Sequence, residues 1–269
     1  SARLLVVVHG CLLSSEFMAL GSGFNKVADN NNLVVFYPQV PVGTNSFDCW
    51  NWFLPENQAK DSGQLRQIAD RIRSLKNEMR LPNAPALLVG MSAGGTTVSG
   101  LLACFPREFA AAAILAGTSY GLADNLKDAE RILREGPPSS PSRGPCAPRD
   151  FKGRLMVMQG KADQIVNPAH AQRIISDFIT ADPADREETK KEGTSTYSIG
   201  DYKGRGQLVM IDRLGHAWPG YNTNFRNHEK VGPAGKFSTR LPFFSSAGPN
   251  ATQLIWQFLN ERPLRSGEP

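Results

Sequence analysis

The chain has 269 residues, 41% of them hydrophobic, and its 30 Lys and Arg against 25 Asp and Glu leave a net charge of +5. A chain of this length and composition can bury a large core, so we expect one domain over residues 1–269. Its basic residues are dispersed and its apolar runs fall far short of the roughly 20 residues that span a bilayer, so we expect neither a nucleic-acid nor a membrane partner.

Short apolar runs alternate with helical patterns along the chain. The predicted strands are 4–8, 33–37, 86–89, 110–116 and 155–158, with two further strand-like pieces in 197–212. The predicted helices are 15–30, 61–79, 92–104, 122–133, 167–179 and a final helix capped by Asn250, and the charged segment 182–192 is predicted to be a solvated loop. This alternation predicts an α/β fold with a mostly parallel central sheet flanked by helices, in which reactive side chains gather at the carboxyl ends of the strands.

A G-x-S-x-G motif, Gly90 to Gly94, follows the predicted strand 86–89 and leads into small residues that can open a helix. A serine hydroxyl is a weak nucleophile, and an enzyme that uses one raises it on a sharp, strained turn where a base can reach it. The motif therefore predicts a nucleophile elbow that carries Ser92. The alternative is a glycine-rich turn without chemistry.

A serine nucleophile needs a base, and the chain has four histidines. His216 is the candidate because it follows a predicted strand within 214–220, a loop whose glycines and proline would hold the ring in place. The alternative for His216 is a surface histidine without a catalytic role. The other three histidines lie at a strand end, within a predicted helix and in a polar loop, and they are His9, His170 and His228.

The base in turn needs a carboxylate that orients its other ring nitrogen. Asp163 follows the strand 155–158 in a carboxyl-end loop, whereas its rival Asp212 is only four residues from His216 and lies close to the strand itself. The chain order Ser92, Asp163, His216 is that of α/β-hydrolases. Asp163 is therefore predicted to orient the base, and a plain turn residue is the alternative.

An oxyanion hole in that fold takes one N–H from the residue after the nucleophile and one from the loop after the third strand. In this chain the two donors would be Ala93 and Cys11. The alternative is that His9 and Gly10 form an ordinary turn at the end of a strand.

Five short motifs together carry a family resemblance: His9-Gly10-Cys11, Cys49-Trp50-Asn51-Trp52-Phe53, Gly90 to Gly95, Gly160-Lys161-Ala162-Asp163 and Gly215-His216-Ala217-Trp218. With them the chain resembles, from about residue 4 to residue 259, the polyhydroxybutyrate depolymerase-like esterases of the α/β-hydrolase superfamily. Such proteins usually have strands before the one that ends in His9-Gly10-Cys11, and here they are absent, so we expect a shorter sheet edge or a trimmed chain.

The resemblance implies a serine esterase that hydrolyses poly(3-hydroxybutyrate) or its short oligomers through an acyl-enzyme, without a cofactor or metal. The same branch is similar to feruloyl and acetylxylan esterases, so plant cell-wall esters are the alternative substrates. A non-catalytic binding protein and a peptidase are alternatives from other classes. We expect a monomer that takes a polyester or a small ester.

The four cysteines are predicted to pair as Cys11–Cys49 and Cys104–Cys146, each pair at one end of the sheet, with free buried thiols as the alternative. Disulfides would imply a periplasmic or secreted protein. The start at Ser1 without Met fits a processed chain whose targeting signal is already gone. Three tryptophans near the predicted triad are expected to wall an acyl pocket, unless they belong to the core, and they are Trp50, Trp52 and Trp218.

Overall fold

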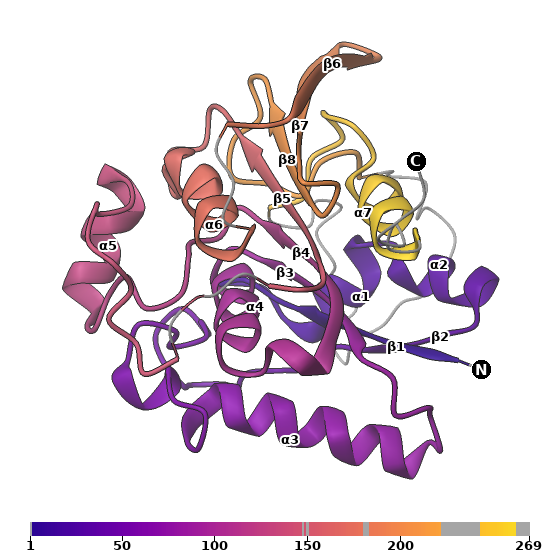
Figure 1. The fold of residues 1–269 in the computed structure, drawn as a ribbon, viewed down its shortest axis with the longest axis vertical. Helices are drawn as coiled ribbons and strands as arrows, with labels where there is room; N and C mark the ends of the chain where they lie inside the picture. Colours follow the sequence, from indigo (N-terminus) through magenta and orange to yellow (C-terminus); the bar gives the residue numbers. More distant parts are fainter. Residues whose placement is uncertain (1, 147, 149–150, 180–182, 222–242, 262–269) are drawn as a thin grey trace, which may run out of the picture.

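The computed structural model describes residues 2–146, 148, 151–179, 183–221 and 243–261. Within them one sheet runs in the order β2-β1-β3-β4-β5-β8-β7-β6, parallel from β2 to β8 and antiparallel at β7 and β6 (Figure 1). Its strands are β1 (Arg3–Val8), β2 (Leu33–Phe36), β3 (Ala86–Met91), β4 (Phe109–Leu115), β5 (Arg154–Gly160), β6 (Arg186–Glu192), β7 (Ser195–Tyr202) and β8 (Gly206–Ile211). The predicted α/β class and parallel sheet are confirmed.

Helices cover both faces of this sheet, because the side chains of its central strands are apolar on both sides. One face carries α3 (Gly63–Glu78), α4 (Ala93–Cys104) and α6 (Ala169–Ile179), and the other carries α1 (Ser15–Gly21), α2 (Phe24–Asn31) and α7 (Ala251–Asn260). The helix α5 (Leu126–Glu135) and two short 3₁₀ turns, Pro55–Asn57 and Pro106–Glu108, complete the described elements.

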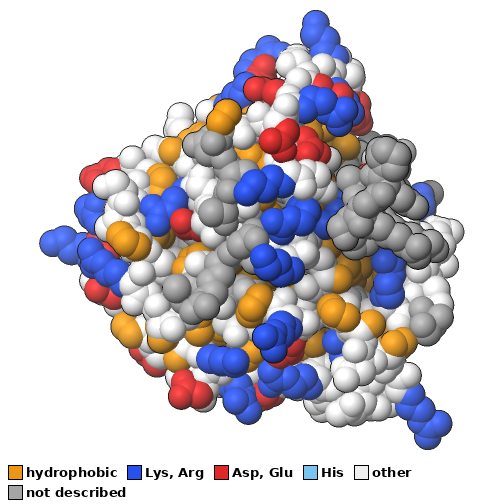
Figure 2. All heavy atoms as spheres, viewed as in Figure 1, with side chains coloured by type: hydrophobic (Ala, Val, Ile, Leu, Met, Phe, Trp, Pro, Cys, Tyr) orange, Lys and Arg blue, Asp and Glu red, His pale blue; other side chains and the backbone are white. Residues whose placement is uncertain are grey.

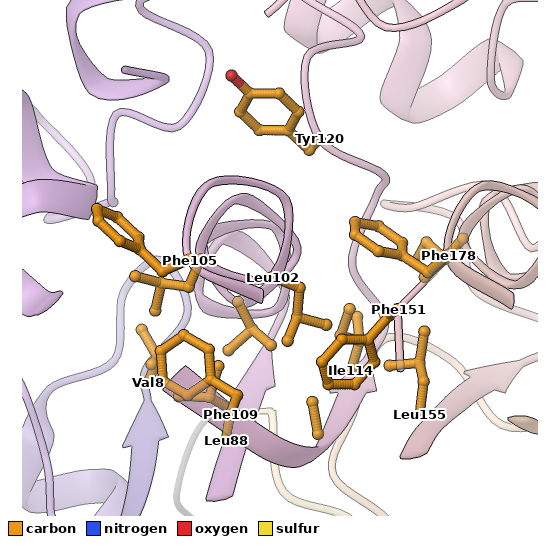
Figure 3. Close-up of a cluster of buried hydrophobic side chains, with 14 of the residues drawn as sticks. Val8, Leu88, Leu102, Phe105, Phe109, Ile114, Tyr120, Phe151, Leu155 and Phe178 are labelled. Carbon is orange, nitrogen blue, oxygen red and sulfur yellow. The ribbon is translucent and has the colours of Figure 1, made fainter. Parts of the chain in front are cut away.

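Two large hydrophobic clusters lie on the two faces. Alternate residues of β1 divide between them, with Val6 on the side of α3 and α4 and Val7 on the side of α1 and α7, and both are fully buried. Figure 3 shows part of the first cluster, where Leu102 of α4 packs near Leu88 of β3 and Ile114 of β4. This packing holds the carboxyl ends of the central strands at one rigid edge.

Two sequence expectations about secondary structure were wrong. The predicted helix 15–30 is two helices, because Gly23 adopts a left-handed φ of 76° between them. The predicted solvated loop 182–192 contains the fully exposed strand β6. Its antiparallel pairing with the backbone of β7 holds it in a strand conformation. Charged side chains, which gather at the top of Figure 2, suit a sheet edge because they oppose pairing with another chain.

Two disulfides tie loops to the sheet, and their pairing is the expected one. Cys11 is bonded to Cys49 at the end of the sheet that carries the predicted elbow. Cys104, the last residue of α4, is bonded to Cys146. The first bond therefore fastens the loop after β1, where an oxyanion donor is predicted. A single domain over 1–269 stays a prediction, since the described residues do not span the whole chain.

Candidate active site

Ser92 lies on a strained turn between β3 and α4, with φ 56° and ψ −124°. The glycines on either side of it are required by close packing. A Cβ on Gly90 would lie 2.4 Å from the carbonyl oxygen of Gly94, and a Cβ on Gly94 would lie 2.3 Å from the carbonyl oxygen of Val8. The motif thus forms the sharp turn that the sequence predicts, and the tight contacts give the physical reason for both glycines.

The three residues of the predicted triad meet at the carboxyl edge of the sheet. Nε2 of His216 lies 2.9 Å from Oγ of Ser92, and Nδ1 of His216 lies 2.8 Å from Oδ2 of Asp163. Ser92 follows β3, Asp163 follows β5, and His216 follows β8. The side chain of His216 is 7% exposed and that of Asp163 is fully buried, so the Asp–His pair is shielded from water.

Asp163 is held as a carboxylate by hydrogen bonds at both of its oxygens. Oδ1 accepts the backbone N–H groups of Ile165 and Val166, each at 2.9 Å. Burial acts to raise the pKa of Asp163, but the hydrogen bonds from His216 and from these two amides outweigh it and hold the pKa below its ordinary value. With Asp163 ionised, Nδ1 of His216 carries the proton, and Nε2 is left to accept the proton of Ser92.

The other candidate residues have structural partners elsewhere. Nε2 of His9 accepts the backbone N–H of Val40 at 3.2 Å, which leaves Nδ1 to donate to the carbonyl of Gly10 at 2.8 Å. His170 is fully buried between Oγ1 of Thr118 and the carbonyl of Ile132. Burial lowers the pKa of both histidines, so each is a neutral hydrogen-bonding group.

The rival carboxylate does not face the base. Oδ1 of Asp212 lies 2.7 Å from Nζ of Lys161 in a solvent-exposed ion pair. Asp163, not Asp212, is therefore the carboxylate that contacts His216. The remaining histidine, His228, lies outside the described residues.

The two predicted oxyanion donors border the same cavity as Ser92. Ala93 begins α4, and Cys11 is held by its disulfide and by the N–H of Leu12, which donates to the carbonyl of Phe47 at 2.8 Å. No described residue accepts a hydrogen bond from the backbone N–H of Cys11 or of Ala93. Both donors are thus available to a ligand above Ser92.

A cavity of about 180 Å³ opens beside Ser92, and we call it the serine pocket. It is mostly apolar, which suits the acyl part of an ester more than a charged group. Its lining residues are Cys11, Leu12, Leu13, Trp52, Met91, Ser92, Ala93, Thr96, Leu133, Ile165, Val166, His216 and Phe243.

Of the three tryptophans expected in the pocket wall, one is there. Trp52 lines the serine pocket. The expectation for Trp50 and Trp218 was wrong, because both are core residues. Trp50 is 3% exposed and packs against the ring of His9 at 5.3 Å. Trp218 is 1% exposed, stands edge-on to Phe24 at 6.0 Å, and donates from Nε1 to Thr252 of α7.

Several pocket residues were missed by the sequence analysis. Leu12 and Leu13 directly follow Cys11, and Ile165 and Val166 closely follow Asp163, so apolar residues next to predicted catalytic positions were the usable signal. Phe243 had no such signal. Its ring stands edge-on to His216 at 5.8 Å, a contact between residues separated by more than twenty positions.

Two negative findings apply to the described part of the chain. No group of three or more His, Cys, Asp or Glu side chains is placed there to hold a metal ion. None of the helices found there has the length and hydropathy that crossing a membrane requires.

A mostly parallel sheet with a serine elbow after β3, an aspartate after β5 and a histidine after β8 defines an α/β-hydrolase. Solved structures of this class share the fold. An acetyl xylan esterase from Aspergillus awamori matches with a TM-score of 0.70 at 15% identity, over 80% of this chain and 84% of that one. SOBER1 of Arabidopsis thaliana matches with a TM-score of 0.50 at 12% identity, over 96% of this chain and 98% of that one.

The family is shown by the sequence itself. The family model described as "Esterase PHB depolymerase" matches residues 1–194, and the chain belongs to that family. Poly(3-hydroxyalkanoate) depolymerase C of Paucimonas lemoignei is 24% identical over 231 residues, which are 81% of this chain and 56% of the relative. Feruloyl esterase B of Thermothelomyces thermophilus is 22% identical over 65% of this chain and 63% of the relative. The chain therefore spans little more than half the length of depolymerase C.

Proposed function

We propose that this chain is a serine esterase that hydrolyses the ester bonds of poly(3-hydroxybutyrate) or its short oligomers through an acyl-enzyme. The observation that carries the proposal is the continuous hydrogen-bonded line from Ser92 through His216 to Asp163, at the wall of a small apolar pocket. Membership in an esterase family supports the reaction class.

The reaction runs in two halves. Nε2 of His216 takes the hydroxyl proton as Oγ of Ser92 attacks the ester carbonyl, and the carbonyl electron pair moves onto its oxygen. The N–H groups of Cys11 and Ala93 hold that oxyanion, and each donor is worth about 2.7 to 4 kcal/mol in the barrier. When the intermediate collapses, the alcohol leaves with the proton from His216. Water then attacks the acyl-enzyme by the same proton transfers and releases the acid.

The polyester part of the proposal is supported by the apolar surroundings of the serine pocket. Leu12 and Ile165 line this pocket yet remain 54% and 47% exposed, and Phe47, whose carbonyl is bonded to Leu12, is 55% exposed. Exposed apolar side chains at a pocket mouth suit an uncharged aliphatic polymer. Trp52 and Phe243 limit the space for the acyl chain, so esters of about C2 to C4 should react best.

Acetylxylan or feruloyl esterase activity is the alternative substrate assignment. The specific observations that favour it are the fold match to an acetyl xylan esterase at a TM-score of 0.70 and the similarity to feruloyl esterase B. A small acyl pocket accepts an acetyl group as readily as a hydroxybutyryl group. The two disulfides also support an oxidising compartment, periplasmic or outside the cell, for either substrate.

One panel of substrates tests the proposal. Purified protein is assayed on 3-hydroxybutyrate trimer, amorphous granules and crystalline films of poly(3-hydroxybutyrate), methyl ferulate and acetylated xylan, with Ser92→Ala as the blank. We expect the highest kcat/KM on the hydroxybutyrate trimer and faster cleavage of amorphous than of crystalline polymer. A higher kcat/KM on ferulate or xylan acetate would transfer the assignment to the alternative and leave the reaction class unchanged.

Two further assays separate other classes of protein. Turnover of p-nitrophenyl butyrate distinguishes an enzyme from a binding protein of the same fold. Aminoacyl p-nitroanilides test for a peptidase, and we expect no turnover of them. An absence of p-nitrophenyl butyrate hydrolysis by folded protein would contradict the esterase proposal itself.

A further inference from the structure

A buried glutamine contacts the Asp163 carboxylate on the same oxygen as the histidine. Gln159 is the residue before the last one of β5, is 1% exposed, and donates from Nε2 to Oδ2 of Asp163 at 2.9 Å. Nδ1 of His216 donates to that same Oδ2 at 2.8 Å. With the two backbone amides on Oδ1, every direction from which the carboxylate accepts hydrogen bonds is filled.

The orientation of the Gln159 amide follows from this contact. Its Nε2 also approaches the carbonyl oxygens of Val166 and Gly160, each at 3.3 Å, so three acceptors surround the NH₂ group. A flipped amide would place Oε1 against three oxygen atoms, which is repulsive. The observed orientation is therefore the one in which the NH₂ group faces Asp163.

The other end of the same amide is poorly satisfied. Oε1 of Gln159 is buried, and no described residue forms a hydrogen bond with it. A buried acceptor without a partner costs stability, and an apolar side chain of the same shape would avoid that cost. Gln159 is thus a poor choice for packing alone, and its one strong contact is with the carboxylate of the proposed triad.

We propose that Gln159 is a positioning residue, which fixes the plane of the Asp163 carboxylate and shares Oδ2 with His216. This inference rests on the proposed function, because Gln159 acts on the reaction only through Asp163 of the proposed triad. The amide keeps the carboxylate from rotating away as the imidazolium forms. Its partial positive charge beside Oδ2 also reduces the electron density that the carboxylate offers to His216.

Loss of the amide has a definite expected direction. Without it, Oδ2 is a stronger acceptor for His216, so the imidazolium is favoured and the acidic limb of the kcat/KM profile moves to higher pH. Among the described residues, the charged groups of the adjoining loops do not compete for this role. Lys161 and Asp212 pair with each other, and Arg213 donates to the carbonyl of Thr194.

Gln159→Met tests the proposal, because it keeps the length of the side chain and removes the donor. We expect a melting temperature equal to or above that of the wild type, a roughly tenfold lower kcat on p-nitrophenyl butyrate, little change in KM, and an acidic limb at higher pH. Gln172→Met is the matched control, since Gln172 also has a buried amide atom that bonds to no described residue, but it lies in α6. The control should keep the wild-type kcat and pH profile.

A wild-type kcat and pH profile in Gln159→Met would overturn the proposal. A lower kcat that comes with a lower melting temperature and an unchanged pH profile would overturn it as well, because lost stability would then explain the effect. Gln159→Leu is the second variant in case the methionine protein does not fold. It also removes the donor and adds no charge, so its acidic limb should move to higher pH as well, and an unmoved limb would again overturn the proposal. Ser92→Ala distinguishes failure of the proposed triad from failure of the role of Gln159. If Ser92→Ala retains activity, the triad itself is wrong. If Ser92→Ala is inactive while Gln159→Met has the kcat and pH profile of the wild type, only the role of Gln159 is refuted.

Discussion

Replacement of Asp163 by asparagine tests the proposed triad most directly. The carboxylate accepts four hydrogen bonds, two at each oxygen. An asparagine has one carbonyl oxygen and one NH₂ group. Only one of the two pairs of donors can therefore face an acceptor, and the other pair faces the NH₂ group. If the carbonyl stays on the amides of Ile165 and Val166, the NH₂ group faces His216. Nδ1 must then act as an acceptor, and the ring proton moves to Nε2.

A proton on Nε2 removes the function of the base. The Nε2 atom lies 2.9 Å from Oγ of Ser92. With a proton it would donate to the Ser92 hydroxyl, whereas the reaction requires it to accept the hydroxyl proton. We expect kcat of Asp163→Asn to fall by roughly 10⁴, or about 5 kcal/mol of transition-state stabilisation. The opposite flip leaves the two backbone amides facing NH₂ and loosens the loop that holds residue 163. Both orientations therefore lower activity.

The measurement is steady-state hydrolysis of p-nitrophenyl butyrate, with circular dichroism and thermal melting to establish folding. Asp212→Asn is the matched control, because Asp212 is an exposed carboxylate paired with Lys161 on neighbouring loops. It should keep wild-type kcat, since surface ion pairs contribute little. A folded Asp163→Asn protein with more than a tenth of the wild-type kcat would refute the role that we assign to Asp163.

Three further predictions concern the same site. Ser92→Ala and His216→Ala should each lower kcat by a factor of roughly 10⁶ without unfolding the protein. A folded Ser92→Ala enzyme with a tenth of the wild-type activity would falsify the assignment of Ser92 as the nucleophile. Gly94→Ala should lower the free energy of unfolding in urea by about 3 kcal/mol, because its Cβ would lie 2.3 Å from two main-chain oxygens. Gly215→Ala should be close to neutral, because no atom of the described residues would lie within 4 Å of its Cβ. Because the pKa of Asp163 is held below 3.8 in the folded state, its ionised form stabilises the protein above that pH, and the stabilisation is lost as pH falls through the folded value. The free energy of unfolding of Asp163→Asn should therefore vary less with pH below about 4 than that of the wild type, and equal slopes in urea titrations would contradict this.

The sequence by itself determined the class of fold and the three residues that meet at the carboxyl edge. Buried-strand patterns and glycine spacing are local properties, because they depend on backbone angles and on which faces of a segment are apolar. The rule that the carboxyl ends of parallel strands share one edge favours Asp163 over Asp212 and His216 over His170 from the sequence alone. The cysteine pairs followed from the same placement of strand and helix ends.

Only the tertiary structure decided which side chains line the pocket and which fill the core. Trp218 lies two residues from His216, yet it turns to pack on Phe24 and α7, contacts that the spacing of residues along the chain does not encode. Phe243 contacts His216 from a distant part of the chain, and the side chain of Gln159 donates to Asp163 across the turn that follows β5. Even the strand β6 exists because β7 pairs with it, since its charged sequence contains no apolar face. Local patterns specify the backbone, whereas the neighbours of a side chain are set by packing between segments that are distant in sequence.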